Sequence, residues 1–267
     1  MNDASTAARR QPEEVARAFL TPRPPKERQA LPLEDGEVLR IATSEGEVVL
    51  QRAGTGPLVL LLHGWEGQPA DLAAFVAPLR RAGFGVLAMD LPAHGASAGH
   101  QMSIPQAARA LVAVGKVLGP LHSAIAHSIG SAVLAEALTA GLSVRRAVLI
   151  AAPAHYERFA RGFADAAGLD TRGTEAMLGW PQTMIGSDVR EISLPRRAPH
   201  LVQPALFIHS SDDRVVAVED SLASAAAWPG AHHIRVDGLG HRRILSDASV
   251  VAAAMAFVNT TPVWASP

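Results

Sequence analysis

The sequence AHSIG, at residues 126–130, is the most informative stretch of this chain. An apolar run at residues 122–126 precedes the turn, and a helix-like run at residues 129–138 follows it. A serine on a tight turn between a strand and a helix presents its hydroxyl group away from the sheet. Such a turn is usually written G-x-S-x-G, and here Ala126 replaces the first glycine with the next smallest side chain. We therefore expect Ser128 to be a nucleophile, the alternative being a small residue at a tight turn.

A stricter match to the same pattern occurs at residues 95–99, with the sequence GASAG. Its context differs, because the strand-like run before it ends at Asp90 and loop-forming residues, including Pro105, follow it. The motif requires a strand, a turn and a helix in succession. We therefore expect Ser97 to be an ordinary serine in a glycine-rich loop.

A serine nucleophile needs a general base, and His241 is the candidate among eleven histidines. It follows Gly238 and Gly240, which make a flexible turn after a strand-like run at residues 233–236. An imidazole on such a loop can reach the serine, and a neutral imidazole accepts a proton near pH 7.

The acid that orients the base is expected between these two residues in the chain. Asp212 and Asp213 follow a strand-like run at residues 205–208. A carboxylate at the end of a strand can accept the second N–H of the imidazole and fix its tautomer. Either residue could instead serve the turn, where aspartate is common.

The chain order Ser128, Asp213, His241 resembles that of the α/β-hydrolase superfamily. Three further segments share the resemblance, which spans residues 57–258: LVLLLHGW at 58–65, AMDLPAHGAS at 88–97 and HSSDDRVV at 209–216. The last is similar to the pattern H-G-x-x-D-x-x-V, with serine at position 210, and this register favours Asp213 over Asp212. Together these motifs are specific for the fold but much less specific for the substrate.

The resemblance implies a serine hydrolase that cleaves carboxylic esters through an acyl-enzyme intermediate. It also implies an oxyanion hole made by the backbone N–H groups of Trp65 and Ile129. A serine nucleophile argues against the haloalkane dehalogenases and epoxide hydrolases of the superfamily, which use aspartate. Thioesterase, lactonase, carbon–carbon bond hydrolase and acyltransferase activities remain open, as does a non-catalytic ligand-binding role.

Strand-like and helix-like runs alternate through most of the chain, which predicts an α/β fold with a mostly parallel central sheet and helices on both faces. A hairpin is expected at residues 38–52. We expect an N-terminal appendage at residues 1–33, the first part of an α/β-hydrolase core at 34–154, a small helical cap insertion at 155–200 and the second part of the core at 201–267. The insertion is longer than a simple crossover needs, and in the superfamily such an insertion usually covers the active site.

The apolar residues of this cap suggest a pocket for short to medium acyl chains. The residues expected to line the substrate pocket are Trp65, Phe159, Trp180 and Met184. Packing in the protein core is the alternative for each of them.

The composition agrees with this interpretation: 267 residues, 48% of them apolar and 18% charged, make a globular balance. The formal net charge of -1 suggests neither nucleic acid nor an anionic membrane as a partner. The absence of cysteine excludes disulfides and thiolate metal sites. No metal or cofactor is expected, and His63, His127 and the pair 232–233 are interpreted as structural. We find neither a signal-peptide pattern nor an apolar run long enough to span a membrane, and we expect a cytoplasmic protein. The expected partner is a small-molecule ester. The sequence leaves the oligomeric state open.

Overall fold

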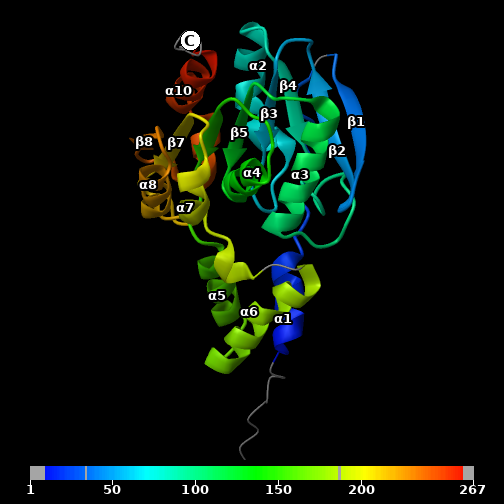
Figure 1. Cartoon of the computed structure of the whole chain (residues 1–267), viewed down its shortest axis with the longest axis vertical. Coiled ribbons are helices and arrows are strands. Elements are labelled where there is room, and N and C mark those ends of the chain that lie inside the picture. The colour runs from blue at the N-terminus through cyan, green and yellow to red at the C-terminus, as the bar shows by residue number, and fades with distance from the viewer. Residues whose placement is uncertain (1–9, 34, 186–187, 261–267) are drawn as a thin grey trace, which may run out of the picture.

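A single eight-stranded sheet forms the centre of the molecule, with the strand order β1-β2-β4-β3-β5-β6-β7-β8 (Figure 1). The computed structural model of the chain describes residues 10–33, 35–185 and 188–260, and for residues 181–185 it describes the backbone alone. The strands are β1 (Glu37–Thr43), β2 (Gly46–Ala53), β3 (Leu58–Leu62), β4 (Gly85–Met89), β5 (Ser123–His127), β6 (Ala147–Ile150), β7 (Ala205–Ser210) and β8 (His232–Val236). The hairpin β1–β2 is antiparallel and β2 pairs antiparallel with β4, whereas all later pairs are parallel. The expected mostly parallel sheet is confirmed.

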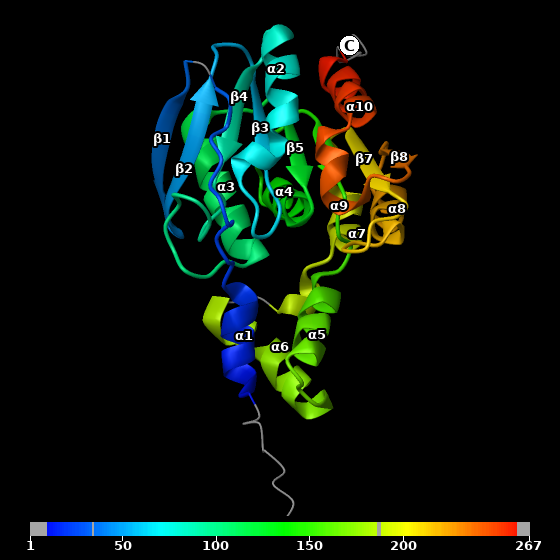
Figure 2. The same ribbon diagram turned by 180° about the vertical axis from the view of Figure 1, so that it is seen from behind.

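Helices cover both faces of the sheet, as the two opposite views show (Figures 1 and 2). The helices of the core are α2 (Ala73–Arg81), α3 (Ile104–Leu118), α4 (Ile129–Thr139), α8 (Val218–Ala227), α9 (Gly240–Arg243) and α10 (Ala248–Asn259), with short 3-10 helices η1 (Pro69–Leu72) and η4 (Ile244–Ser246). Helices α3 and α4 lie on one face and α2 and α10 on the other. The 3-10 helix η1 leads directly into α2.

The side chains of each central strand alternate between two separate hydrophobic clusters. In β3, Leu60 and Leu62 belong to the cluster beneath α3 and α4, whereas Val59 and Leu61 belong to the cluster beneath α2 and α10. All four side chains are fully buried. A parallel sheet buried on both faces reads as a continuous apolar run, which explains the sequence VLLL at residues 59–62.

A helical insertion connects β6 to β7. It comprises α5 (Tyr156–Ala166), α6 (Thr171–Ile185), η2 (Val189–Glu191), α7 (Leu194–Arg197) and η3 (Ala198–His200). Helices α5 and α6 project as a lobe beyond the end of the sheet (Figures 1 and 2). The prediction of helices at residues 155–200 agrees with these elements.

Residues 1–33 were expected to form an appendage, yet their helix α1 (Pro12–Leu20) packs within the lobe, against α6 and α5. The ring of Phe19 lies 5.2 Å from that of Tyr156 and 5.5 Å from that of Phe163, centroid to centroid. Val15 and Leu20 of α1 are also buried, so this helix has an apolar face. The local sequence does not indicate which helices that face packs against. Helix α1 is therefore an integral part of the lobe rather than a separate appendage.

The segment that leaves α1 returns along the loop that follows β3. Arg23 Nε donates to Glu66 Oε1 at 2.9 Å, and the backbone N–H of Gln29 donates to Gln68 Oε1 at 3.0 Å. Arg28 pairs with the buried Asp90 at 2.7 Å. The N-terminal segment thus ties the lobe to the β3 loop.

Within the described parts of the chain, no helix is both long enough and apolar enough to cross a membrane.

Candidate active site

Ser128 occupies the turn between β5 and α4 with φ 52° and ψ −125°. A non-glycine residue in such a conformation costs about 1–3 kcal/mol and persists only where its surroundings hold it. Here the N–H of Ser128 donates to Ile150 O at 2.9 Å, and Ser128 O accepts from the N–H of Ser131 at 2.9 Å. The turn therefore has the strained strand-to-helix geometry that the AHSIG sequence predicted.

The residues two positions before and after Ser128 are small for separate structural reasons. A Cβ atom added at Gly130 would lie 2.6 Å from His63 O and 2.9 Å from Leu62 O, so α4 can approach the end of β3 only with glycine there. Ala126 is fully buried, and its carbonyl oxygen accepts from Ser131 Oγ at 3.0 Å. Alanine in place of the usual glycine is thus accommodated within the sheet.

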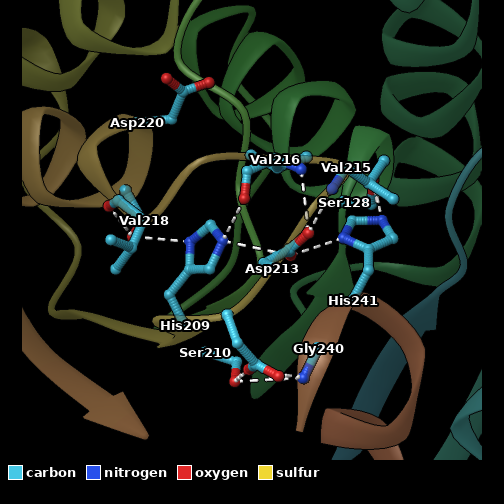
Figure 3. A network of polar contacts seen from close by, with 12 residues as sticks. Ser128, His209, Ser210, Asp213, Val215, Val216, Val218, Asp220, Gly240 and His241 are labelled. Carbon is cyan, nitrogen blue, oxygen red and sulfur yellow. Dashed lines mark hydrogen bonds and ion pairs between the residues drawn. The ribbon is translucent and has the colours of Figure 1, made fainter. Parts of the chain in front are cut away.

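His241, the first residue after Gly240 in α9, brings its imidazole to this serine. Its Nε2 lies 3.1 Å from Ser128 Oγ, and its Nδ1 lies 2.7 Å from Asp213 Oδ2 (Figure 3). A carboxylate only accepts, so Nδ1 carries the proton and Nε2 is left to accept from the serine hydroxyl. The structure therefore joins Ser128, His241 and Asp213 in one chain of hydrogen bonds, with the imidazole of His241 in the middle.

Asp213, rather than Asp212, contacts the imidazole. Its Oδ1 accepts from the N–H groups of Val215 and Val216 at 2.8 and 2.9 Å. Burial alone would raise the pKa of Asp213, but hydrogen bonds from His209, His241 and the amide of Val216 outweigh it and hold that pKa well below the usual value. This carboxyl group is therefore ionised at neutral pH.

Asp212 has a different task, since it is exposed and holds the loop that carries His241. Its Oδ1 accepts from the N–H of Gly240 at 3.0 Å and from the hydroxyl of Ser210. Ser210 Oγ in turn accepts from the N–H of Leu239 at 3.1 Å. The serine that replaces the family's glycine at position 210 thus helps to fix the same loop.

The loop after β3 lies directly against Ser128, because a Cβ atom added at Gly64 would lie 3.2 Å from Ser128 Cβ. Within the described residues, neither the N–H of Trp65 nor that of Ile129 donates to a protein acceptor. Both groups belong to segments that touch Ser128. The two backbone donors expected for an oxyanion hole are therefore available.

Two buried histidines that the sequence analysis did not assign to the site hold this loop. His63 Nδ1 donates to Gly64 O at 2.7 Å, and His94 Nε2 accepts from the N–H of Glu66 at 3.1 Å. Burial lowers the pKa of His63 to about 3 and, to a lesser degree, that of His94. Both rings are thus neutral at pH 7 and act as fixed hydrogen-bonding groups.

The alternation of side chains along a strand predicts that His127 points away from its neighbour Ser128, but its ring instead packs against His241. Its Nε2 lies 2.9 Å from His241 O, and the two rings lie 4.7 Å apart, centroid to centroid. Burial and the nearby His241 lower the pKa of His127 to about 3. The structural role expected for His127 holds, but the expected direction of its side chain was wrong.

A cavity of about 370 Å³ opens beside Ser128. It is lined by Gly64, Trp65, Glu66, Gly67, Asp71, His127, Ser128, Val215, His241, Arg242, Leu245 and Ser246. Of the residues expected to line the pocket, Trp65 does so. Phe159 and Trp180 are not among the lining residues and pack against the larger hydrophobic cluster, while the side chain of Met184 lies outside the described part of the chain. Val215 and Leu245 supply apolar walls that the sequence analysis missed, although both lie within four residues of a motif residue.

Ser97, in the rejected motif match, is a buried structural residue. Its Oγ donates to Asp90 O at 2.6 Å and accepts from the N–H of Val49 at 2.8 Å. The first bond lies within the loop after β4, and the second ties that loop to β2. Among the residues that the structure describes, no group of three or more potential ligands is arranged to hold a metal ion.

Comparison with known proteins identifies the family and the fold. A sequence model described as "Alpha/beta hydrolase family" matches residues 59–254. The chain is 28% identical to a pimeloyl-[acyl-carrier protein] methyl ester esterase of Xanthomonas campestris pv. campestris (strain B100), over 78% of this chain and 98% of the relative. A protein of the same name from Stenotrophomonas maltophilia (strain K279a) is also 28% identical, over 76% and 92% of the two chains.

Solved structures share the fold. The esterase Pf2001 of Pyrococcus furiosus superimposes with a TM-score of 0.71 at 19% identity, over 90% of this chain and 98% of that one. The esterase RhEst1 of Rhodococcus sp. ECU1013 does so with a TM-score of 0.64 at 21% identity, over 84% and 98%.

Proposed function

This chain belongs to the alpha/beta hydrolase family, and we propose that it is a serine hydrolase that cleaves carboxylic esters of short to medium acyl chain. The observation that carries the proposal is the pair of contacts made by His241: 3.1 Å from Nε2 to Ser128 Oγ and 2.7 Å from Nδ1 to Asp213 Oδ2. A positioned serine, base and acid on three separate loops of one sheet is the arrangement that acyl transfer requires.

In the first half of the reaction, Ser128 Oγ attacks the ester carbonyl carbon while His241 Nε2 takes the hydroxyl proton. The electron pair of the carbonyl moves onto its oxygen, where the N–H groups of Trp65 and Ile129 stabilise the charge. When the carbonyl re-forms, the bond to the alcohol oxygen breaks and His241 gives its proton to that oxygen. The alcohol leaves, and the acyl group remains on Ser128 as an ester.

In the second half, water replaces the alcohol. His241 Nε2 takes a proton from the water molecule, whose oxygen attacks the acyl carbon. Collapse of this second intermediate releases the carboxylic acid and returns the proton to Ser128 Oγ. Asp213 remains ionised throughout and stabilises the imidazolium that forms in each half.

The size of the cavity supports a small substrate. Its volume of about 370 Å³ lies near the lower end of the ~300–1,000 Å³ range of ligand pockets. Trp65, Val215 and Leu245 give it apolar walls. We propose Trp65 as a pocket residue on this basis. We also propose that the helical insertion at residues 155–200 is a cap, because it leaves the sheet at the carboxyl end of β6, the edge at which Ser128 follows β5.

The relatives' printed name favours one set of substrates for the first test. They are called methyl ester esterases of an acyl group on a carrier protein, so methyl esters of medium-chain acids belong in the test panel beside p-nitrophenyl esters. Thioesters, lactones and added acceptor alcohols in the same panel separate thioesterase, lactonase and acyltransferase activities, which the same three side chains could support. Vinylogous diketone substrates test the carbon–carbon bond hydrolase alternative.

The decisive experiment is labelling with a fluorophosphonate probe, followed by peptide mapping. We expect a single covalent adduct on the peptide that contains Ser128, absent from the Ser128→Ala variant and retained in Ser97→Ala. Label on another serine would overturn the assignment. No label, together with no turnover of any ester, would favour the non-catalytic ligand-binding role.

A further inference from the structure

A second imidazole contacts Asp213 from the side opposite His241 (Figure 3). His209 lies in β7 and is fully buried, and its Nε2 is 3.3 Å from Asp213 Oδ2. The same oxygen accepts from His241 Nδ1 at 2.7 Å. One carboxylate oxygen is thus shared between two imidazole rings that come from opposite ends of the β7–α9 segment.

The surroundings of His209 determine which of its ring nitrogens carries a proton. Its Nε2 also lies 3.0 Å from Val216 O, and both a carbonyl and an ionised carboxylate can only accept. Nε2 is therefore a donor that faces two acceptors. His209 thus always presents an N–H, and never a lone pair, to Asp213.

The other ring nitrogen is held by a buried serine. His209 Nδ1 lies 2.7 Å from the Oγ of Ser221, a fully buried residue of α8. Ser221 Oγ is also 2.8 Å from Nε2 of His233, on β8, and 2.9 Å from Val218 O. The hydroxyl has one proton and two lone pairs, so it donates to one of these neighbours and accepts from any of the ring nitrogens that carries a proton. Its contact with Nδ1 fixes the plane of the His209 ring.

We propose that His209 is a positioning residue for the reaction, held in place by Ser221, and that its Nε2–H orients the Asp213 carboxylate and moderates its basicity toward His241. This inference rests on the proposed roles of Ser128, Asp213 and His241. The Nε2–H of His209 bonds to Val216 O at 3.0 Å and also lies 3.3 Å from Asp213 Oδ2, where its positive end withdraws charge from the oxygen that pairs with His241. Without it, Asp213 holds a protonated His241 more tightly and is less well oriented.

Several charged or titratable groups lie around this network, among them Arg242, which follows His241 and lines the same cavity. His127, on β5, faces His241 and is neutral at pH 7 because burial lowers its pKa to about 3. Asp220, on α8, accepts from the N–H of Ala154 at 3.2 Å and pairs with Arg158 at 3.3 Å. His233, on β8, has its pKa lowered by burial and by His209. Asp212 is bound to Gly240.

The test is the pH dependence of kcat/KM in four single variants of the full chain. His209→Leu removes the donor, whereas His209→Gln keeps an N–H at a similar reach. Ser221→Ala keeps His209 but removes the hydroxyl group that contacts its Nδ1. Ser224→Ala is the matched control, because Ser224 is also buried on α8 and its Oγ donates to Asp220 O at 2.8 Å without touching His209.

We expect His209→Leu to lower kcat by roughly ten- to a hundredfold, the size typical of partners that orient a functional side chain. In the same variant, the rising limb of the pH profile of kcat/KM should move to higher pH by roughly half a unit to one unit. Ser221→Ala should move the limb in the same direction by less, His209→Gln should return it toward the wild-type position, and Ser224→Ala should leave both kcat and the limb unchanged.

An unshifted pH profile in a folded His209→Leu protein would overturn the inference. So would an equal shift in Ser224→Ala, which would mark a general response of α8. Should His209→Leu fail to fold, Ser221→Ala against Ser224→Ala decides the question alone. Failure of the proposed function is distinguishable, since it would appear as loss of probe labelling at Ser128 in the wild-type protein, whatever the pH profiles of these variants.

Discussion

His127 Nε2 lies 2.9 Å from the carbonyl oxygen of His241, so the residue beside Ser128 holds the main chain of the histidine that contacts Ser128. The bond joins the end of β5 to α9, two segments far apart in the sequence. Because a carbonyl oxygen only accepts, His127 must be protonated at Nε2, and its low pKa of about 3 leaves Nδ1 unprotonated. The position of His241 therefore depends on His127 as well as on Asp213.

Acid should destabilise this protein through its buried neutral histidines. The pKa values of His63 and His127 are lowered to about 3, from about 6.5 in an unfolded chain. The unfolded state thus binds more protons below about pH 6.5, so stability falls as the pH falls from there toward 3. We expect a loss of roughly 2 kcal/mol for each of the two histidines between pH 7 and pH 5.

Urea unfolding at several pH values measures this loss. The matched variant is His127→Gln, which keeps an N–H donor but cannot be protonated. Its stability should depend less steeply on pH, by the contribution of one histidine, even if its stability at pH 7 is lower. Parallel slopes for the variant and the wild type would mean that His127 does not stay neutral in the folded state.

The two serines of the competing motifs should respond in opposite ways to alanine substitution. Ser128→Ala should lower kcat by about 10⁴-fold or more while leaving the fold intact, since removal of a serine nucleophile typically costs that much. Ser97→Ala should keep the kcat of the folded enzyme. It should instead lower stability by roughly 1–3 kcal/mol, because the N–H of Val49 then loses its buried acceptor.

Ester turnover and thermal unfolding of both variants separate the two effects. Near-full activity in Ser128→Ala, or a large loss of kcat with unchanged stability in Ser97→Ala, would reverse the assignment.

The neighbouring aspartates give a second matched pair. Asp213→Asn should lower kcat by around 10⁴-fold, because an amide donates to His241 Nδ1 and so leaves the wrong tautomer facing Ser128. Asp212→Asn should cost far less, since an amide oxygen can still accept from the N–H of Gly240. Steady-state kinetics on one ester suffices, and equal losses in the two variants would contradict the distinct contacts of the two carboxylates.

Much of this arrangement was predictable because it follows from local sequence. The AHSIG turn predicts Ser128, and the glycines before His241 indicate the histidine. The resemblance of residues 209–216 to the superfamily pattern then favours Asp213 over Asp212. The alternation of strands and helices predicts the order of elements in the sheet core. Each of these features depends on residues close together in the chain.

Contacts between distant segments were not predictable in the same way. Nothing near His127 indicates that its ring meets His241, and nothing near His209 indicates that Ser221 lies behind it. Phe159 and Trp180 were expected to line the pocket because they are large and apolar. The directions of side chains on α5 and α6, however, depend on packing against the core and α1. Size and apolar character identify a buried side chain but not the cavity that it faces.

The acyl-chain preference should follow the cavity beside Ser128. Each methylene that the cavity accepts contributes roughly 0.8 kcal/mol, so two more should raise kcat/KM by about tenfold until the space is filled. A cavity of about 370 Å³ fills early, and we expect a maximum at short to medium chains. Trp65→Ala should move this maximum toward longer chains, because the indole lines the cavity.

Trp180→Ala is the control, since Trp180 packs against the hydrophobic cluster and is not among the lining residues. It should leave the position of the maximum unchanged, with any loss appearing in stability. The measurement is a kcat/KM series from acetate to palmitate esters for the wild type and both variants. A monotonic rise to palmitate would contradict a small pocket. A maximum that moves in Trp180→Ala but not in Trp65→Ala would place the acyl chain beneath the lobe instead of beside Trp65.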